Sequence, residues 1–207
     1  MAALLFVPAW TVDYWQAWVF LAVFGVASLA TTLYLMEKDP KLLERRVQAG
    51  PTAEKERSQR IIQFLTSLMF IAMLVVPALD HRFAWTPVPS AVAIVGDMLV
   101  ALGFLLIFFV YRENTFASAT IEIAEGQKVI STGMYGLVRH PMYFGGLFLL
   151  VGMPLSLGSL SGLVVYALFM PALLWRIFDE ERFLASNLPG YAEYQRKVRY
   201  RLLPHIW

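Results

Sequence analysis

The chain has 207 residues, of which 58% are hydrophobic and 15% are charged, and its formal net charge is +2. Soluble domains have roughly 45–50% apolar and about 25% charged residues, so this composition excludes an ordinary soluble domain and indicates an integral membrane protein. The chain has no cysteine, which excludes disulfides, thiolate metal sites and a cysteine nucleophile.

The N-terminal half contains three apolar segments long enough to cross a membrane, for which about 20 apolar residues are needed. They are Tyr14–Met36, Ile61–Leu79 and Ser90–Tyr111. Trp15 and Trp18 near the start of the first segment are typical of an aromatic belt at the membrane interface. Because the residues before them lack a basic stretch and a cleavage site, we expect the first segment to stay in place as a signal anchor.

The polar stretch Glu37–Arg60 follows the first segment, and its apolar Leu42 and Val47 predict a short helix lying on the membrane surface. The C-terminal half contains two further apolar segments, Pro141–Leu157 and Leu160–Phe178. A very short turn joins these two segments, which predicts an antiparallel helical hairpin. Glycines in the first of the two segments favour close packing against a neighbouring helix.

These segments together predict an all-α, polytopic membrane protein with about five transmembrane helices and a C-terminal helical hairpin. The sequence shows no internal repeat and no linker, so we expect residues 1–207 to form a single domain whose motif-bearing core is 112–207. An amphipathic connection between 112 and 140 links the third and fourth helices.

The basic residues are distributed unevenly along the chain. Seven fall in Glu37–Arg60, three in Arg112–His140 and six from Arg176 to the end, against one in Asp80–Pro89. With five helices the first three of these segments share one side of the membrane. The positive-inside rule then predicts that this side is cytoplasmic, that the N-terminus lies outside, and that the C-terminus and any site near it face the cytoplasm.

The densest group of special-purpose residues is the run GQKVISTGMYGLVRHPMYFGG at 126–146. Its glycines permit close backbone approach, and Pro141 suits the first residue of a helix. Free N–H groups at a helix start can hold an anionic group, which favours a binding site here. The alternative is that Arg139 and Tyr143 are interface anchors whose polar ends reach the headgroups.

A second group, Arg176-x-x-x-Glu180-Glu181-x-x-Leu184, lies at the end of the last apolar segment and is followed by Tyr191-x-x-Tyr194 and Pro204. Together with the run Gln127-Lys128-Val129-Ile130-Ser131-x-Gly133-x-Tyr135-x-x-Val138-Arg139-His140-Pro141-x-Tyr143-x-Gly145, it resembles the isoprenylcysteine carboxyl methyltransferase family. The wider group includes the membrane phospholipid N-methyltransferases. The resemblance covers 114–207, and the N-terminal half shares only the hydrophobic layout.

The resemblance implies S-adenosylmethionine as methyl donor and a lipophilic acceptor, above all the carboxylate of an isoprenylcysteine-like substrate. The cofactor-binding residues that it implies are Gln127, Lys128, Val129, Ile130, Tyr135, His140, Pro141, Met142, Tyr143 and Glu180. Many family members have histidine where this chain has Gln127, so only the backbone at that position is assigned. Glu180, an acceptor when ionised, would take hydrogen bonds from the cofactor.

Arg176 and Glu180 are the implied catalytic residues, with Arg176 orienting the acceptor carboxylate. The alternative for Arg176 is an ordinary ion pair with Glu180 one helical turn away. If the acceptor were an amine, Glu180 or Glu181 would be the nearest general base. Faces of Tyr135, Tyr143 and Trp175 are expected to attract a sulfonium.

Three further features complete the sequence picture. Asn114 and Phe116 are expected to border the pocket, and Asp97, inside the third helix, is expected to make a structural hydrogen bond or to be a neutral acid. The histidines are too scattered for a metal site. The basic and aromatic tail Tyr191–Arg201 is expected to contact anionic membrane lipid rather than nucleic acid.

Other functions stay open on the sequence alone. A phospholipid amine or a small lipophilic thiol would be an alternative methyl acceptor on the same scaffold. A sterol-reductase-like enzyme with a nicotinamide cofactor would have a related helical core. A non-catalytic membrane scaffold is the alternative of a different class.

Overall fold

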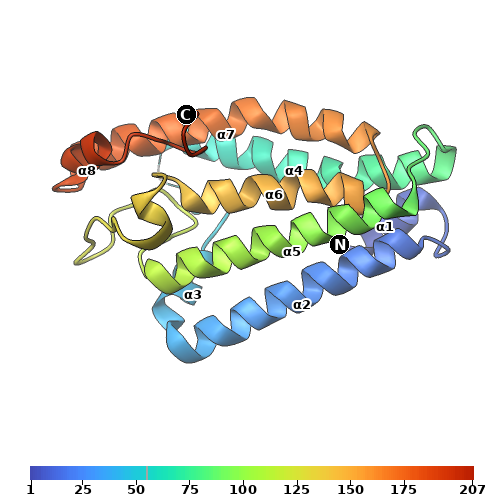
Figure 1. The fold of residues 1–207 in the computed structure, drawn as a ribbon, viewed down its shortest axis with the longest axis horizontal. Coiled ribbons are helices and arrows are strands. Elements are labelled where there is room, and N and C mark those ends of the chain that lie inside the picture. The colour runs from blue at the N-terminus through green and yellow to red at the C-terminus, as the bar shows by residue number, and fades with distance from the viewer. Residues whose placement is uncertain (55) are drawn as a thin grey trace.

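A computed structural model describes residues 1–54 and 56–207, and these residues form helices and loops without a strand. Lys55, one of the basic residues counted above, lies outside the described residues. The helices run side by side in an elongated bundle (Figure 1). In chain order they are α1 (Ala2–Ala9), α2 (Trp15–Lys38), α3 (Pro40–Val47), α4 (Arg57–Phe83), α5 (Ser90–Glu113), the 3₁₀ turn η1 (Gly133–Gly136), α6 (Pro141–Ser156), α7 (Ser161–Asn187) and α8 (Tyr191–Lys197).

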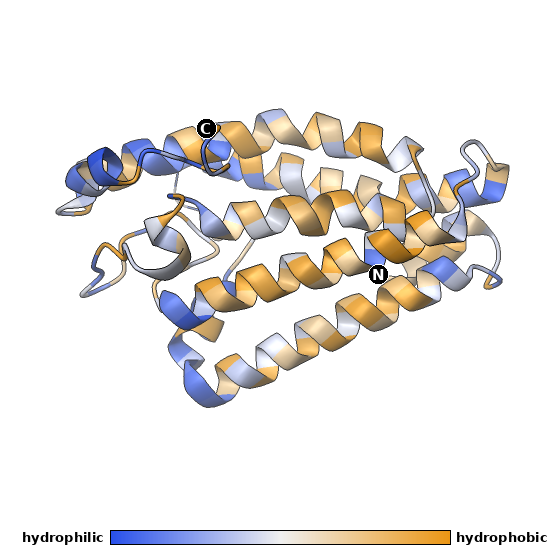
Figure 2. Cartoon of the chain, in the orientation of Figure 1, coloured by the Kyte–Doolittle hydropathy of each residue, from blue (hydrophilic) through white to orange (hydrophobic). Residues whose placement is uncertain are grey.

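Within the described ranges, the four helices α2, α4, α5 and α7 are long and apolar enough to cross a membrane, and α6 is apolar but shorter. Apolar residues cover the middle of the bundle and hydrophilic residues gather toward its ends (Figure 2). The all-α fold and the integral membrane class predicted from the sequence are therefore confirmed. Two of the long helices extend beyond their expected bounds: α4 runs from Arg57 to Phe83 rather than from Ile61 to Leu79, and α7 continues past Phe178 to Asn187. α7 stops just before Leu188 and Pro189, where proline disfavours helix in the preceding residue.

The short surface helix predicted in the polar stretch is α3. It begins with Pro40 in its first turn, and the side chain of Asp39 accepts a hydrogen bond of 3.0 Å from the Leu42 backbone N–H. A carboxylate at this position satisfies one of the free donors at a helix start. Leu42 is buried, so α3 packs its apolar side onto the bundle.

Glycines bring α5 and α6 into direct backbone contact. A Cβ added to Gly96 on α5 would lie 2.1 Å from the Ser156 backbone nitrogen, and one added to Gly152 on α6 would lie 2.8 Å from the Gly96 carbonyl oxygen. Gly103 and Gly145 repeat the arrangement closer to the other end of the same pair. Small residues at such crossings let membrane helices pack tightly. The close packing predicted for the Pro141–Leu157 segment is therefore present, and its partner is α5.

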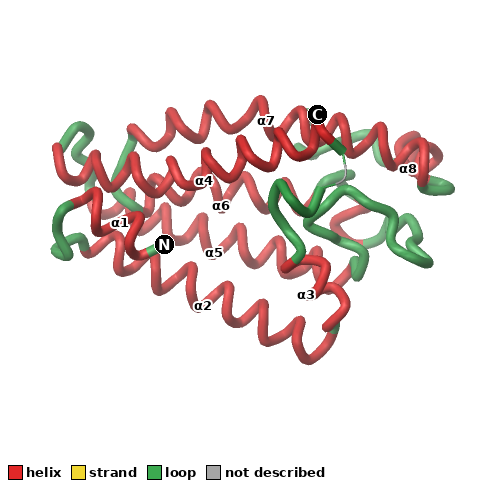
Figure 3. The backbone as a smooth tube through the Cα atoms, turned by 180° about the vertical axis from the view of Figure 1, so that it is seen from behind, coloured by secondary structure: helices red, strands yellow, loops and turns green. Residues whose placement is uncertain are grey.

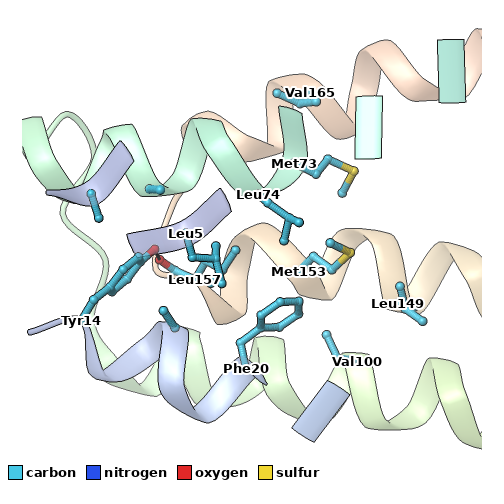
Figure 4. Close-up of a cluster of buried hydrophobic side chains, with 13 residues drawn as sticks. Leu5, Tyr14, Phe20, Met73, Leu74, Val100, Leu149, Met153, Leu157 and Val165 are labelled. Carbon is cyan, nitrogen blue, oxygen red and sulfur yellow. Dashed lines mark hydrogen bonds between the residues drawn. The ribbon is translucent and has the colours of Figure 1, made fainter. Parts of the chain in front are cut away.

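The main apolar core lies at the end of the bundle where α1 packs against α4 (Figure 4). Tyr14 is fully buried there, and its hydroxyl donates a hydrogen bond of 2.6 Å to the Leu157 carbonyl oxygen at the end of α6. The long 114–140 connection, α3 and α8 gather at the opposite end (Figure 3). The residues of both sequence motifs lie at that second end.

Candidate active site

A cavity of about 420 Å³ lies where the 114–140 connection meets α6, α7 and α8. Every residue of the site predicted from the sequence lines this cavity: Gln127, Lys128, Val129, Ile130, Tyr135, His140, Pro141, Met142, Tyr143, Arg176 and Glu180. Asn114 and Phe116, expected at its border, line it as well. The structure thus brings together two motifs that are well separated in the sequence; what they bind stays a prediction.

The start of α6 and the C-terminal half of α7 meet through Tyr143 and Glu180. The Tyr143 hydroxyl donates a hydrogen bond of 2.6 Å to Glu180 Oε2, and His140 Nδ1 lies 3.9 Å from Glu180 Oε1. The Glu180 side chain is 24% exposed, so this carboxylate can still accept a hydrogen bond from a ligand. The hairpin expected from the short turn at Gly158 accounts for this meeting.

Glu181, the next residue along α7, links α7 to the residues before α6 and to the C-terminal tail. Its Oε1 accepts from Arg139 Nε at 2.6 Å and lies 3.2 Å from His140 Nε2, while Oε2 accepts from Arg201 Nε at 2.9 Å. The Arg139 and His140 backbone N–H groups donate to the Tyr200 and Arg201 carbonyl oxygens, each at 2.9 Å. Arg139 is therefore a buried structural group, and the interpretation of this residue as a headgroup anchor is wrong.

Tyr135 is held from both sides in the cavity wall. Asn114 Nδ2 donates to its hydroxyl at 2.8 Å, and the Tyr194 hydroxyl donates to its carbonyl oxygen at 2.8 Å. Burial raises the pKa of the Tyr135 phenol above its ordinary value, and burial likewise raises the pKa of Tyr194. Both hydroxyl groups therefore stay protonated at neutral pH, and the Tyr135 O–H can donate a hydrogen bond to a ligand.

Arg176 lies in the cavity wall but its ion-pair partner is Glu54. Arg176 Nη1 donates to Glu54 Oε1 at 2.6 Å and to Gln59 Oε1 at 2.7 Å, and Nη2 donates to the Ala119 carbonyl oxygen at 2.9 Å. The alternative of an ion pair with Glu180 is not realised among the described residues; Glu180 instead accepts from Tyr143. Sequence reasoning missed Glu54 and Gln59 because both lie in a stretch that reads as a solvated surface.

Two aromatic expectations need correction. Trp175 is 42% exposed on α7 and does not line the cavity, because it lies on the apolar outer side of a membrane helix. In the tail, Tyr191 and Tyr194 are buried against Val198 and Leu188, so the aromatic residues of that stretch form a small core. The basic residues Arg196, Lys197 and Arg199 are exposed, and lipid contact by them stays a prediction.

Asp97 lies away from the cavity, at the crossing of α5 and α6. Its Oδ1 accepts a hydrogen bond from the Ser156 hydroxyl, and Oδ2 has no partner within the described residues. The structural hydrogen bond expected for this residue is therefore present. No group of histidine and carboxylate side chains in the described ranges is arranged to hold a metal ion.

Comparison with known proteins finds a family model that matches the part of the chain around the cavity. Residues 91–189 match the model of the phospholipid methyltransferase family. The match covers 99 of the 207 residues, just under half of the chain. The family lies within the isoprenylcysteine carboxyl methyltransferase-like group, so the resemblance stated from the sequence is confirmed. The matched segment contains all but the first residue of α5, the whole of α6 and α7, and the connection that forms most of the cavity wall.

Two curated relatives match part of the chain. A Delta(14)-sterol reductase of Mus musculus, TM7SF2, is 28% identical over 138 residues, which cover 58% of this chain and 33% of the relative. The cobalt-zinc-cadmium resistance protein CzcN of Cupriavidus metallidurans is 32% identical over 108 residues, which cover 50% of this chain and 49% of the relative. The matches span between a third and a half of the length of these relatives.

Proposed function

We propose that the cavity binds S-adenosylmethionine and that the protein transfers its methyl group to a lipophilic acceptor, above all the carboxylate of an isoprenylcysteine-like molecule. The family match supports a membrane methyltransferase. The observation that carries the finer proposal is the convergence of both sequence motifs on one cavity at the polar end of a membrane bundle.

The residues present fit such a cofactor. The cavity of about 420 Å³ falls in the range of roughly 300–1,000 Å³ usual for small-molecule sites. Glu180 offers a carboxylate acceptor to hydroxyl or amino donors, and Tyr135 offers a phenol donor. S-adenosylmethionine, when bound, supplies an electrophilic methyl group on a sulfonium. The rings of Tyr135 and Tyr143 present faces that attract such a cation, each worth roughly 0.5–2 kcal/mol.

The apolar side of the cavity suits a lipophilic acceptor. Leu150, Phe169 and Leu173 line it on the membrane side. A shallow apolar groove shares Leu150 and Phe169 with the cavity and continues along α4 to Phe70 and Ile71. Apolar residues on this path would hold a hydrocarbon chain while the reacting end lies beside Arg176.

The methyl transfer requires the protein mainly to position the two reactants. An ionised carboxylate oxygen of the acceptor attacks the methyl carbon, the carbon–sulfur bond breaks, and its electron pair stays on the sulfur. Such an attack needs no general base, because the nucleophile carries no proton to remove. Orientation and exclusion of water then supply the acceleration, up to about 7–11 kcal/mol. We infer that Arg176, which lines the cavity, orients the carboxylate.

Equilibrium binding of S-adenosylhomocysteine to the detergent-purified protein tests the cofactor assignment. We expect the wild type to bind, and Glu180→Gln to bind at least about tenfold more weakly, since a hydrogen bond to a charged group contributes roughly 1.5–3 kcal/mol. Glu193→Gln, an exposed carboxylate on α8, is the matched control and should bind like the wild type. A folded wild type that does not bind S-adenosylhomocysteine would overturn the proposal.

A second candidate is suggested by the sterol reductase relative. In that case the same cavity would take a nicotinamide cofactor, and the protein would reduce a carbon–carbon double bond of a lipophilic substrate. Binding of NADPH, measured beside S-adenosylhomocysteine on the same preparation, separates the two. Tight NADPH binding without S-adenosylhomocysteine binding would favour the reductase, and the reverse would favour the methyltransferase.

Transfer of a labelled methyl group then identifies the acceptor. We expect N-acetyl-S-farnesylcysteine to be methylated in preference to phosphatidylethanolamine. Methylation of the phospholipid amine alone would keep the methyltransferase and replace the proposed acceptor.

A further inference from the structure

The N-terminal half of the chain reaches the candidate active site through Arg176. Glu54, in the loop before α4, and Gln59, in the first turn of α4, both accept hydrogen bonds from Arg176 Nη1, at 2.6 and 2.7 Å. Both residues lie outside the segment that matches the family, and neither lines the cavity. They contact Arg176, the residue proposed to orient the acceptor carboxylate, on the side away from the cavity.

The contacts of Gln59 fix which end of its amide faces Arg176. Gln59 Nε2 donates to Asp179 Oδ2 at 2.9 Å, which leaves the amide oxygen directed at Arg176 Nη1. Asp179 and Arg176 lie three residues apart on α7, so Gln59 ties the two through a residue of α4. Gln59 is only 2% exposed, and a buried amide with both ends paired is held in one orientation.

Glu54 is also held on several sides. Its Oε1 takes a hydrogen bond of 3.3 Å from Gln63 Nε2, its Oε2 takes one of 3.3 Å from the Ile121 backbone N–H, and its carbonyl oxygen takes one of 2.8 Å from Arg60 Nε. The residue is 2% exposed. A carboxylate fixed by the loop, α4 and the 114–140 connection is in turn a fixed partner for the guanidinium.

Two of the three remaining N–H groups of Arg176 are also occupied, which leaves one N–H on Nη2 for an acceptor carboxylate. Nη2 donates to the Ala119 carbonyl oxygen at 2.9 Å, and Nε donates to the Tyr143 hydroxyl at 3.3 Å. Tyr143 in turn donates to Glu180. The guanidinium therefore has one position, and its charge is compensated by a buried carboxylate rather than by solvent.

We propose that Glu54 is a positioning residue of the active site, which acts through Arg176 by fixing the guanidinium and compensating its charge. The inference rests on the proposed function in one respect, since it takes Arg176 to be the acceptor residue. Glu54 does not line the cavity, so the proposal gives it no contact with the cofactor or the acceptor. Gln59 supports the same guanidinium without a charge.

The charge compensation gives Glu54 a distinctive kinetic effect. With Glu54 ionised, an anionic acceptor meets a guanidinium whose charge is already balanced. Without that carboxylate, the guanidinium attracts the anion more strongly but is held less firmly, and a displacement of about 1 Å can cost about 10²-fold in rate. Loss of the Glu54 charge should therefore lower kcat without raising KM for an anionic acceptor.

A double-mutant cycle on thermal unfolding in detergent tests the coupling, and it needs no acceptor. The variants are Glu54→Gln, Arg176→Gln and the two together. We expect each single substitution to lower Tm, and the double variant to be no less stable than the worse single one, because both remove the same interaction. Additive losses would show that the two residues act independently and would overturn the inference.

Methyl-transfer kinetics on the same variants test the positioning role. Concentrations of active protein are set by S-adenosylhomocysteine binding, which Glu54→Gln should leave within about twofold of wild type because Glu54 does not line the cavity. We expect Glu54→Gln to lower kcat at least about tenfold with N-acetyl-S-farnesylcysteine while KM stays the same or falls. Glu54→Asp, which keeps the charge, should recover part of kcat.

The matched control is Glu56→Gln, two residues along the same loop and exposed, which should behave as the wild type. A Glu54→Gln protein with wild-type kcat would overturn the positioning role, and so would a rise in KM accompanied by loss of S-adenosylhomocysteine binding. A wild type that binds S-adenosylhomocysteine but methylates neither test acceptor would refute the proposed acceptors. The unfolding cycle would still decide whether Glu54 and Arg176 are coupled.

Discussion

Arg139 and Glu181 form a buried ion pair between the start of α6 and the C-terminal half of α7, with Nε 2.6 Å from Oε1 and each side chain 7% exposed. Arg201 joins the same carboxylate from the C-terminal tail at 2.9 Å. The two motifs of the sequence are therefore connected by charge as well as by the hairpin turn. Glu181 supports the cavity without lining it.

Glu181→Gln should destabilise the protein strongly. The substitution leaves Arg139 without its carboxylate, and breaking a buried ion pair from one side costs about 3–5 kcal/mol. Chemical or thermal unfolding in detergent measures this loss. Arg182→Gln is the control: its side chain is 80% exposed and lies 3.7 Å from Asp179, so the change should stay within about 0.5 kcal/mol. Equal stability of the two variants would contradict the structural role of Glu181.

Gly152→Ala should disrupt the crossing of α5 and α6. The added methyl group would lie 2.8 Å from the Gly96 carbonyl oxygen and from the Val100 nitrogen, both backbone atoms that cannot move aside. Overpacking of this kind costs typically about 1–3 kcal/mol. Gly25→Ala on α2 meets nothing within 4 Å and should be neutral or stabilising by up to about 1 kcal/mol. Unfolding midpoints of the two variants in one detergent compare them, and a tolerated Gly152→Ala would refute the close contact.

Asp97→Asn should leave binding of S-adenosylhomocysteine unchanged. The amide oxygen can accept the same hydrogen bond from Ser156, and Asp97 does not line the cavity. Ser156→Ala removes that bond and should cost about 0.5–1.5 kcal/mol of stability. Cofactor binding and unfolding are measured on the same preparations. Loss of binding in Asp97→Asn would assign this buried carboxylate a functional role that the structure does not show.

The orientation proposed from the basic residues can be tested by cysteine labelling, because the natural chain has no cysteine. Ala192→Cys in α8 and Ser90→Cys at the start of α5 are both at exposed positions. A membrane-impermeant maleimide should label Ala192→Cys only from the cytoplasmic side and Ser90→Cys only from the opposite side. Labelling of both from one side would overturn the assigned topology.

The sequence was informative wherever a local rule applied. Apolar length predicted the long helices, the short turn at Gly158 predicted the hairpin, and the motif at 126–146 predicted the residues around one cavity. Pro189 predicts the end of α7, whereas the hydropathy pattern alone placed that end at Phe178. In each case the information lies within one turn or one helix of the chain.

The sequence was least informative for contacts between distant segments. Glu54 and Gln59 lie in a polar stretch, and nothing in their spacing indicates that both would be buried against Arg176. Likewise Gly96 and Gly103 gain their meaning only from Gly145 and Gly152 on the partner helix, at the same seven-residue separation. Trp175 has the aromatic ring expected at a cation site, but its position around the helix axis directs that ring to the outer surface of the bundle.

The backbone contact between α5 and α6 also limits how ligands can enter and leave. The 114–140 connection starts at the end of α5 and finishes at the start of α6, so both of its ends are fixed to one rigid pair of helices. These ends cannot separate without breaking the glycine crossings. Opening of the cavity must therefore come from the middle of the connection, from α4 or α7, or from the tail, and a substitution that loosens those elements would change exchange rates while leaving the contact between α5 and α6 intact.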